Sequence, residues 1–281
     1  MTFNVMRLCA LNVCDTATPS MTTADSAYPA TNLQDPSRTE ARTTSVAADR
    51  EFKWTWASSQ RINWMGLFRH NFTGAATIAW TFYSDAAWTT AISGATSGTI
   101  TAFNATLLGR MMSAEGVYSQ RLRALKNSVY EFAQVYTNVR SVKAVVNDGA
   151  NADGHLAVGR AFGGEYLALD RSAAFGAGCE WVEEAERRRR RSGALRTTAR
   201  LPEQFRRWSL PMPPVDSADR ALLSELSWYA GERRDMFFSL YPGNGTILEL
   251  ENQGLVKFVA RGRLAHIVPS HWQTDFTLEE A

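Results

Sequence analysis

The polar segment at 147–154 combines residue types that bind calcium. Its carboxylate and amide side chains belong to Asn147, Asp148, Asn151 and Asp153. An EF-hand needs its invariant glycine at the sixth loop position, and placing Gly154 there puts Gly149 at the first ligand position and Arg160 at the bidentate acidic position. This spacing excludes an EF-hand. The segment is instead predicted to be a turn between two strands, and no metal site is expected.

Other residue types used in catalysis are dispersed along the chain. The histidines are His70, His155, His266 and His271, and their spacing fits neither HExxH nor another zinc motif. No nucleophile elbow is present. The cysteines are Cys9, Cys14 and Cys179, an odd number without a CxxC pair, which favours a reduced compartment over a disulfide framework. We therefore expect no catalytic residue, no cofactor and no enzymatic activity.

An arginine run suggests a surface for charged partners. Its members are Arg187, Arg188, Arg189, Arg190 and Arg191. Clustered guanidinium groups bind phosphates, but the formal net charge of the chain is only +2, which favours a solvated face or a protein interface over nucleic acid. If the segment is helical, glutamates four residues earlier would also pair with these arginines. We predict an assembly interface here and no nucleic-acid partner.

The nine tryptophans are the other residues that could carry a function, because aromatic faces stack on sugar rings. Four of them alternate within predicted strands and are expected in the core, namely Trp54, Trp56, Trp64 and Trp80. Trp88 follows the turn-like sequence SDAA and has the least strand-like surroundings. It is the candidate glycan contact, although a core position is the commoner role for such a residue.

Alternation of period two predicts a mostly β protein whose first domain, residues 1–178, is an antiparallel sandwich. Strands are expected at 3–14, 52–56, 62–68, 77–84, 94–103, 142–147 and 155–164, and 16–45 should be an ordered loop. The stretch 113–132 is predicted to hold a short helix, because Leu122, Leu125, Val129 and Phe132 fit one helical face.

A smaller α+β domain is predicted at 179–281, entered through the charged segment at 180–208. Its one main helix should cover 218–230, because Asp216 and Ser217 precede the apolar stripe as capping residues and Gly231 follows it as a stop. Strands should flank it at 235–241, 246–250, 255–260, 263–268 and 272–278.

The first residues lack a secretory pattern, and no window approaches the roughly 20 apolar residues of a membrane span. We expect synthesis and folding in the cytoplasm.

Three segments of the first half resemble the galactose-binding, discoidin-like jelly roll found in tail proteins of bacteriophages. They are AYPATNL at 27–33, INWMGLFRHNFTGAATIAW at 62–80, and VRSVKAVVND with DGHLAVGRAFGG at 139–164. The matching residues are Asn32 and Leu33, His70 and Asn71, and the segment from Gly159 to Gly163. The second half, with RRWSLPMPPVDSADRALLSELSWYAG and DMFFSLYP, is similar to C-terminal domains of phage tail-tip and baseplate proteins.

The resemblance implies a structural protein of the virion tail tip or baseplate. Such a protein would assemble with other copies of itself in a ring and contact tail tube, hub and fibre proteins. An alternative is a carbohydrate-binding module that attaches the particle to host surface glycans, and a third hypothesis is a glycan-degrading enzyme.

Overall fold

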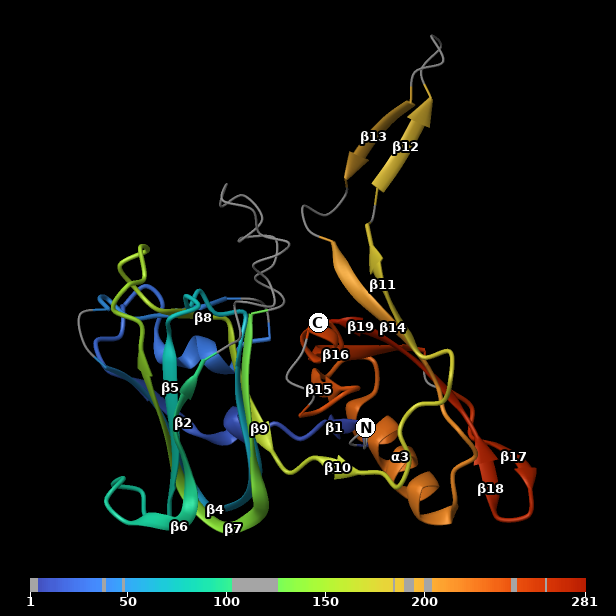
Figure 1. Cartoon of the computed structure of the whole chain (residues 1–281), viewed down its shortest axis with the longest axis horizontal. Coiled ribbons are helices and arrows are strands. Elements are labelled where there is room, and N and C mark those ends of the chain that lie inside the picture. The colour runs from blue at the N-terminus through green and yellow to red at the C-terminus, as the bar shows by residue number, and fades with distance from the viewer. Residues whose placement is uncertain are drawn as a thin grey trace.

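A computed structural model describes residues 5–36, 39–46, 49–102, 126–183, 185–189, 195–199, 204–243, 247–260 and 262–281. The described chain is mostly antiparallel strand with one long helix, which confirms the predicted fold class. It forms two β-rich units side by side, and a narrow pair of strands projects from the second (Figure 1). We call these the sandwich unit, the seven-stranded unit and the arm.

The sandwich unit is built on a sheet with the order β2-β4-β7-β5-β6, in which β9 also pairs with β4. These strands are β2 (Thr18–Met21), β4 (Arg50–Phe68), β5 (Thr77–Tyr83), β6 (Ala91–Thr101), β7 (Asn127–Asn147) and β9 (Arg160–Gly164). The ordered-loop region contains the 3-10 turns η1 (Val13–Thr16) and η2 (Ala30–Gln34) and the strand β3 (Ala41–Arg42), which pairs with β8 (Ala157–Val158).

Strand β4 runs without interruption through 50–68, where the sequence predicts two strands. Its pairing with β7 changes register between Thr55 and Trp64, so both strands bend there and each contributes to both sides of the fold. Before the bend, buried and partly exposed residues alternate. After it, every residue from Ile62 to Phe68 is buried. A strand buried on both faces reads as a continuous apolar run, and here one face meets the sandwich core and the other meets the seven-stranded unit.

Aromatic side chains fill the sandwich core, as the alternation predicts. Trp54 and Trp80 are fully buried and stack with ring centroids 6.1 Å apart. Trp56 is also buried, and its indole Nε1 donates to the backbone oxygen of Val13 at 2.7 Å. This contact ties η1 to the core.

The second unit is a sheet with the order β10-β1-β15-β16-β19-β14-β11. Its strands are β1 (Arg7–Cys9), β10 (Leu167–Ala168), β11 (Gly178–Val182), β14 (Phe205–Pro211), β15 (Met236–Ser239), β16 (Gln253–Ala260) and β19 (Asp275–Glu280). The hairpin of β17 (Ala265–Val268) and β18 (His271–Gln273) lies beside it. The N-terminal strand therefore belongs to this sheet, and Arg7–Cys9 is the strand that the described residues 5–14 form within the stretch predicted at 3–14. The division of the chain at 178 stays a prediction, while β1 and β10 come from before that point.

Helix α3 (Ser217–Ala230) packs on one face of this sheet, and it confirms the predicted main helix. The Asp216 side chain accepts hydrogen bonds from the backbone N–H groups of Ala218 and Asp219, both at 2.9 Å, which satisfies two free donors of the first turn. The helix ends at Gly231, whose φ of 52° is a conformation that glycine adopts without strain.

Three predicted elements are wrong in the structure. Residues 247–251 form a short helix, α4 (Ile247–Glu251), where a strand was expected. The part of the predicted 113–132 helix that begins at Asn127 lies in β7, because pairing with β4 and β5 decides its conformation; residues 113–125 lie outside the described residues. The charged segment is a set of strands and not a connecting passage.

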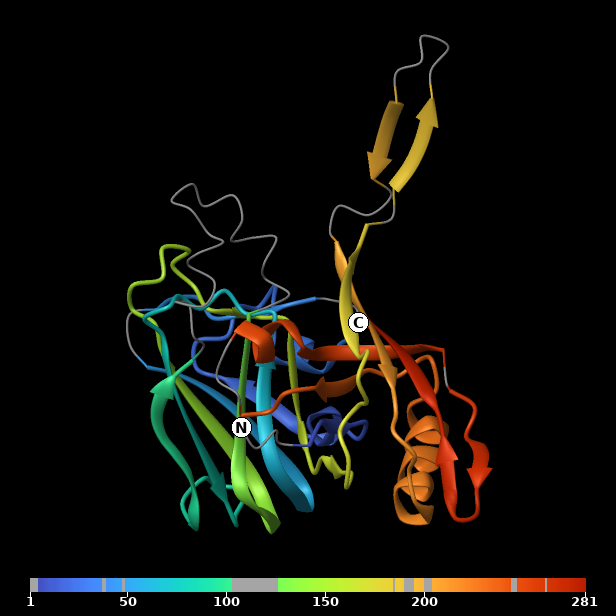
Figure 2. The ribbon, with the colours of Figure 1, turned by 45° about the vertical axis from the view of Figure 1, so that its right-hand side comes forward.

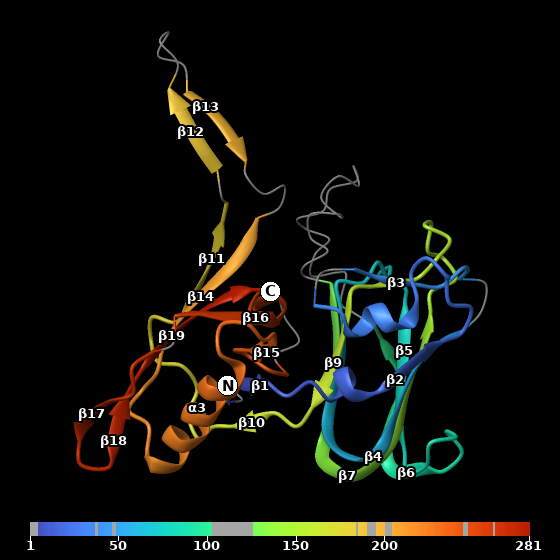
Figure 3. The ribbon, with the colours of Figure 1, turned by 180° about the vertical axis from the view of Figure 1, so that it is seen from behind.

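The arm consists of β12 (Ala185–Arg189) and β13 (Leu195–Ala199), which pair with each other in a two-stranded sheet. It extends beyond β11 and β14 and points away from both units in all three views (Figures 1, 2 and 3). Because this backbone is extended, residues four positions apart are not neighbours as they are in a helix, so the i,i+4 ion pairs expected for a helix are not expected here. The register instead places Arg188 opposite Arg196.

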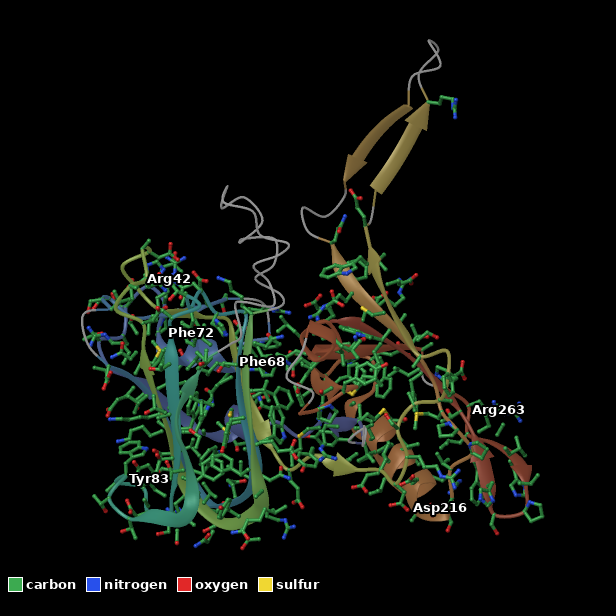
Figure 4. All side chains as sticks on the ribbon, viewed as in Figure 1. Arg42, Phe68, Phe72, Tyr83, Asp216 and Arg263 are labelled. Carbon is green, nitrogen blue, oxygen red and sulfur yellow. The ribbon has the colours of Figure 1, made fainter. Side chains whose placement is uncertain are left out.

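Aromatic rings join the two units. Trp64 of β4 lies between Phe162 of β9 and Phe237 of β15, with ring centroids 5.6 and 4.2 Å away. Phe68 also contacts Phe237, at 5.9 Å, and lies on the side of the sandwich that faces the second unit (Figure 4). These rings are all at most 3% exposed. The apolar run at the end of β4 is thus buried against the neighbouring unit.

Charged side chains also connect the two units. The Arg160 guanidinium lies 3.0 Å from the Asp15 carboxylate and 3.9 Å from that of Asp235, which also pairs with Lys257 at 3.3 Å. Burial raises the pKa of Asp15, while the nearby Arg160 charge opposes that shift. The two units therefore share polar as well as apolar contacts.

Candidate functional site

The polar segment after β7 is a turn whose side chains hydrogen-bond within the fold. Asp148 accepts from the backbone N–H of Thr73 at 2.9 Å and from the Asn151 amide at 3.0 Å. The Asn71 amide donates to Asp153 at 2.9 Å. These bonds link the turn to the loop after β4, which confirms that the segment is a turn between strands.

The dispersed histidines and cysteines remain apart. His70 is buried and stacks on Phe72, with ring centroids 4.1 Å apart. All three cysteines are free thiols, and burial raises the pKa of Cys9 to about 12 and that of Cys179 to about 11. In the described part of the chain, no group of three or more His, Cys, Asp or Glu side chains could hold a metal ion.

Trp88, the predicted glycan contact, lies in the loop between β5 and β6. Its backbone has a φ of 57°, the ring is half-buried, and the Lys53 ammonium lies 5.2 Å from the ring centroid. Tyr83, which precedes this loop, is on the side of the sandwich away from the second unit (Figure 4). A role in glycan binding stays a prediction for Trp88.

The arginine run lies partly in the arm. Arg187, Arg188 and Arg189 are in β12, with Arg189 exposed, whereas Arg190 and Arg191 lie outside the described residues. The described part of the run lies in the arm, whereas Trp88 lies in the sandwich unit. An assembly interface at the arm also stays a prediction.

A cavity of about 450 Å³ lies between the two units. The sandwich contributes wall residues from β4 and β7, and the seven-stranded unit contributes residues from β1, β15, α4 and β16. The polar and tyrosine side chains of the wall include Arg7, Asn127, Tyr130, Glu131, Tyr166, Ser239, Glu249 and Gln253. Binding sites for small molecules commonly occupy 300–1,000 Å³ and lie at such junctions.

Aromatic rings form the apolar part of the wall. Trp64 and Phe237 belong to the stack that joins the units, so their faces are occupied by neighbouring rings. Tyr130 is half-buried, and its ring is nearly perpendicular to that of Phe132, with ring centroids 4.8 Å apart. Because part of its ring is accessible while Trp64 and Phe237 are buried, Tyr130 is the wall residue best suited to stack on a ligand.

One ionic cluster lies on this wall. Arg7 donates from Nη2 to the Glu131 carboxylate at 3.2 Å, and its guanidinium lies 4.3 Å from the centroid of the Tyr166 ring. The Tyr166 hydroxyl donates to the same carboxylate. Burial and the Glu131 carboxylate raise the pKa of Tyr166 to about 12, and Arg7 partly opposes this shift. The phenol is therefore a permanent donor at neutral pH.

Three buried side-chain polar atoms of the described wall residues have no hydrogen-bond partner. One is the Oγ of Ser239, whose side chain is 1% exposed, and another is Nε1 of Trp64. The third is Nε of Arg7, whose two terminal nitrogens are used by Glu131 and by the backbone oxygen of Val5. Burying a polar group without a partner costs about 1–3 kcal/mol. A ligand or an ordered water in the cavity would remove that cost.

The described wall residues combine carboxylate, amide, hydroxyl and guanidinium groups with an aromatic surface, and no recognised catalytic arrangement is found among them. Sequence reasoning missed the cavity because its residues are far apart in the chain and each has an ordinary local pattern. The one available signal was the stretch at 62–68, which is apolar except for Asn63 and indicates a strand covered on both faces.

The comparisons with known proteins found similarity to solved structures only. No protein-family model and no curated protein sequence matches the chain. A chitosan-binding module of a chitosanase/glucanase from Paenibacillus sp. IK-5 is 14% identical over 55% of this chain and 99% of its own, with a TM-score of 0.34. The family 32 carbohydrate-binding module of NanJ from C. perfringens, in complex with galactose, is 10% identical over 58% of this chain and 100% of its own, with a TM-score of 0.36.

A fucose-binding module from Streptococcus pneumoniae is 9% identical over 56% of this chain and 99% of its own, also with a TM-score of 0.36. TM-scores below 0.5 do not establish a common fold or function. None of these three structures is a tail protein, so the tail-tip role stays a prediction. No helix of the described residues is long and apolar enough to cross a membrane.

Proposed function

We propose that this protein is a non-catalytic saccharide-binding protein and that the cavity between its two units receives the sugar. The observation that carries the proposal is the composition of the cavity wall. A half-buried Tyr130 ring lies among hydrogen-bonding side chains within about 450 Å³.

A sugar ring presents an apolar C–H face and a rim of hydroxyl groups that both donate and accept hydrogen bonds. The Tyr130 ring would stack on the C–H face. The Glu131 carboxylate can accept hydrogen bonds at the rim, the Ser239 hydroxyl can donate or accept, and the unpartnered Nε of Arg7 can donate to a sugar oxygen. Few other small molecules use such a wall so completely.

The test is a glycan-array screen followed by titration calorimetry with the best glycan. Tyr130→Ala should weaken binding about tenfold or more, since one stacked aromatic ring contributes on the order of 1.5 kcal/mol. Trp88→Ala is the matched control, because it removes a half-buried aromatic ring outside the cavity. Circular dichroism checks that both variants fold.

Three outcomes would overturn the proposal. If no glycan binds to the protein, the cavity is not a saccharide-binding site. If Trp88→Ala abolishes binding and Tyr130→Ala does not, the sugar site lies on the outside of the sandwich. If the protein releases reducing ends from a bound polysaccharide, it is an enzyme, and carboxylates such as Glu131 become candidates for catalysis.

A second candidate function is a structural role in a phage tail tip or baseplate, and the projecting arm favours it. A two-stranded hairpin is marginally stable by itself in water, so a partner that packs on β12 and β13 would stabilise it. Other copies of the protein in a ring, or tube, hub and fibre proteins, would be such partners. The protein should then co-purify with virions in a fixed copy number. Its presence in infected-cell lysate but not in virions would refute this role.

A further inference from the structure

Two rows of side chains cross the face of the seven-stranded sheet that meets the sandwich unit. Residues paired directly opposite each other on neighbouring strands lie on the same face of a sheet. One row is apolar, includes Phe237, and belongs to the buried cluster that joins the units. The next row is polar and consists of Arg7 of β1, Ser239 of β15 and Gln253 of β16. All three residues of this polar row line the cavity.

The polar row lacks hydrogen-bond acceptors for its buried donors. Nε of Arg7 and Oγ of Ser239 belong to residues that are opposite each other in the register, and both atoms are buried without a hydrogen-bond partner. Nε1 of Trp64 is the third such atom among the described wall residues. The two nitrogens can only donate, whereas the hydroxyl can donate or accept. A ligand that satisfies these groups must therefore bring an acceptor.

The donor at Arg7 is held in a fixed orientation. Its terminal nitrogens donate to the Val5 backbone oxygen at 3.3 Å and to Glu131 at 3.2 Å, and the guanidinium lies 4.3 Å from the Tyr166 ring centroid. Because a guanidinium is planar, these contacts also fix the direction of its Nε–H. An acidic ligand would have to share this guanidinium with Glu131, and two carboxylates in one site repel each other. A neutral carbonyl oxygen accepts from Nε without that repulsion.

We infer that the polar row is a subsite for an acetamido group, so that the cavity prefers 2-acetamido sugars to the matching 2-hydroxy and 2-amino sugars. The inference rests on the proposed saccharide binding and adds the ligand class. The acetamido oxygen accepts from Nε of Arg7, the amide N–H donates to Oγ of Ser239, and the methyl group lies against the apolar row at Phe237. A hydroxyl group lacks the methyl and the carbonyl, and an ammonium group has no lone pair to offer to Arg7.

The experiment compares methyl glycosides that differ only at C2, carrying an acetamido, a hydroxyl or an amino group, in both the gluco and the galacto series. Titration calorimetry at about pH 6 keeps the amine protonated, as for an α-amino group. In the series that binds, the 2-acetamido sugar should bind about tenfold more tightly than the 2-hydroxy sugar, which corresponds to one hydrogen bond from a charged donor. The 2-amino sugar should bind least tightly.

Ser239→Ala tests the subsite with a signature that a structural serine would not give. Because the buried hydroxyl has no partner, its removal should leave the melting temperature of the sugar-free protein unchanged or raise it by about 2 °C in scanning calorimetry. The same change should weaken binding of the 2-acetamido sugar about fivefold, the contribution of one neutral hydrogen bond, and should affect the 2-hydroxy sugar less.

A second variant and a control locate the effect. Arg7→Lys keeps a positive charge near Glu131 but places a methylene where Nε stands, so it should remove most of the tenfold preference. Ser209→Ala is the control, because it removes an exposed hydroxyl from β14 of the same sheet and Ser209 is not among the described wall residues. It should leave the preference unchanged. Circular dichroism checks that all three variants fold.

The results separate the two claims. If the 2-hydroxy or 2-amino sugar binds as tightly as the 2-acetamido sugar, or if Ser239→Ala and Arg7→Lys both keep the full preference, the subsite is wrong while saccharide binding stands. A melting temperature that falls by more than about 4 °C in Ser239→Ala would also count against the subsite, because it would give the hydroxyl a structural role. If no sugar of either series binds and the glycan array is also empty, the saccharide proposal itself falls.

Discussion

Arg206→Met should destabilise the seven-stranded unit by about 3–5 kcal/mol, because it removes one partner of a buried ion pair. Arg206 is fully buried, and its guanidinium bonds to both oxygens of Glu280, at 2.8 and 3.2 Å. It also donates to the backbone oxygens of Leu250, Glu251 and Gln253 at 2.9–3.3 Å. Methionine fills much of the volume but satisfies none of these acceptors.

The control is Arg207→Met, one residue further along β14. Arg207 pairs with Glu279, but its side chain is 37% exposed. Exposed pairs contribute about 0–1 kcal/mol, so this variant should lose less than about 1 kcal/mol. Urea unfolding followed by far-UV circular dichroism measures both free energies of unfolding.

The pH dependence gives a second readout. Burial alone would raise the pKa of Glu280, but the charge and hydrogen bonds of Arg206 dominate and lower it below its ordinary value of 4.5. A lowered pKa contributes stability that is complete above the unfolded value and disappears as the pH falls through the folded value. The cost of Arg206→Met should therefore shrink in acid. An equal cost for both variants at pH 7, or a cost that grows in acid, would refute the reasoning.

Three further predictions concern packing and capping. Trp80→Ala should lower the free energy of unfolding by about 3–5 kcal/mol in urea titrations, since the ring is fully buried on Trp54; a loss under about 1 kcal/mol would contradict this packing. Asp216→Ala should cost about 1 kcal/mol through loss of the α3 cap, measured as a lower melting temperature, whereas Glu225→Ala on the exposed side of α3 should be nearly neutral. Gly163→Ala should cost about 1–3 kcal/mol in calorimetry, because the new Cβ would lie 2.2 Å from Sδ of Met65 and 3.0 Å from the Trp64 carbonyl oxygen; unchanged stability would show that Met65 can move aside.

Local patterns predicted the strands well where one face is buried and the other is not. The alternating stretch at 77–84 forms β5, and the capping residues at 216 and 231 lie at the two ends of α3. The continuity of β4 through its bend could not be predicted, because the exposed residues Ser58 and Ser59 have the sequence character of a turn between two strands. The helix at 247–251 was missed for a similar reason, since ILELE alternates apolar and polar residues as a strand does.

Long-range pairing could not be predicted from such patterns. Nothing local shows that Leu8 pairs with Phe238, or that Trp64 stacks on Phe237. The cavity depends on these pairings, because they bring Arg7 and Tyr166 beside the wall of β7. Sequence reasoning selected Trp88, in a loop, as the aromatic glycan contact, and the structure adds Tyr130 on the cavity wall as a second candidate.

The place of β1 in the seven-stranded sheet affects how the chain can fold during synthesis. Its partner β15 (Met236–Ser239) leaves the ribosome long after Arg7–Cys9, and the whole sandwich is made in between. Pairing of segments so distant in sequence is slow, because a long loop must close first. Until then the edge of β1 stays open to other nascent chains, which makes the interval before residue 236 the period of greatest aggregation risk.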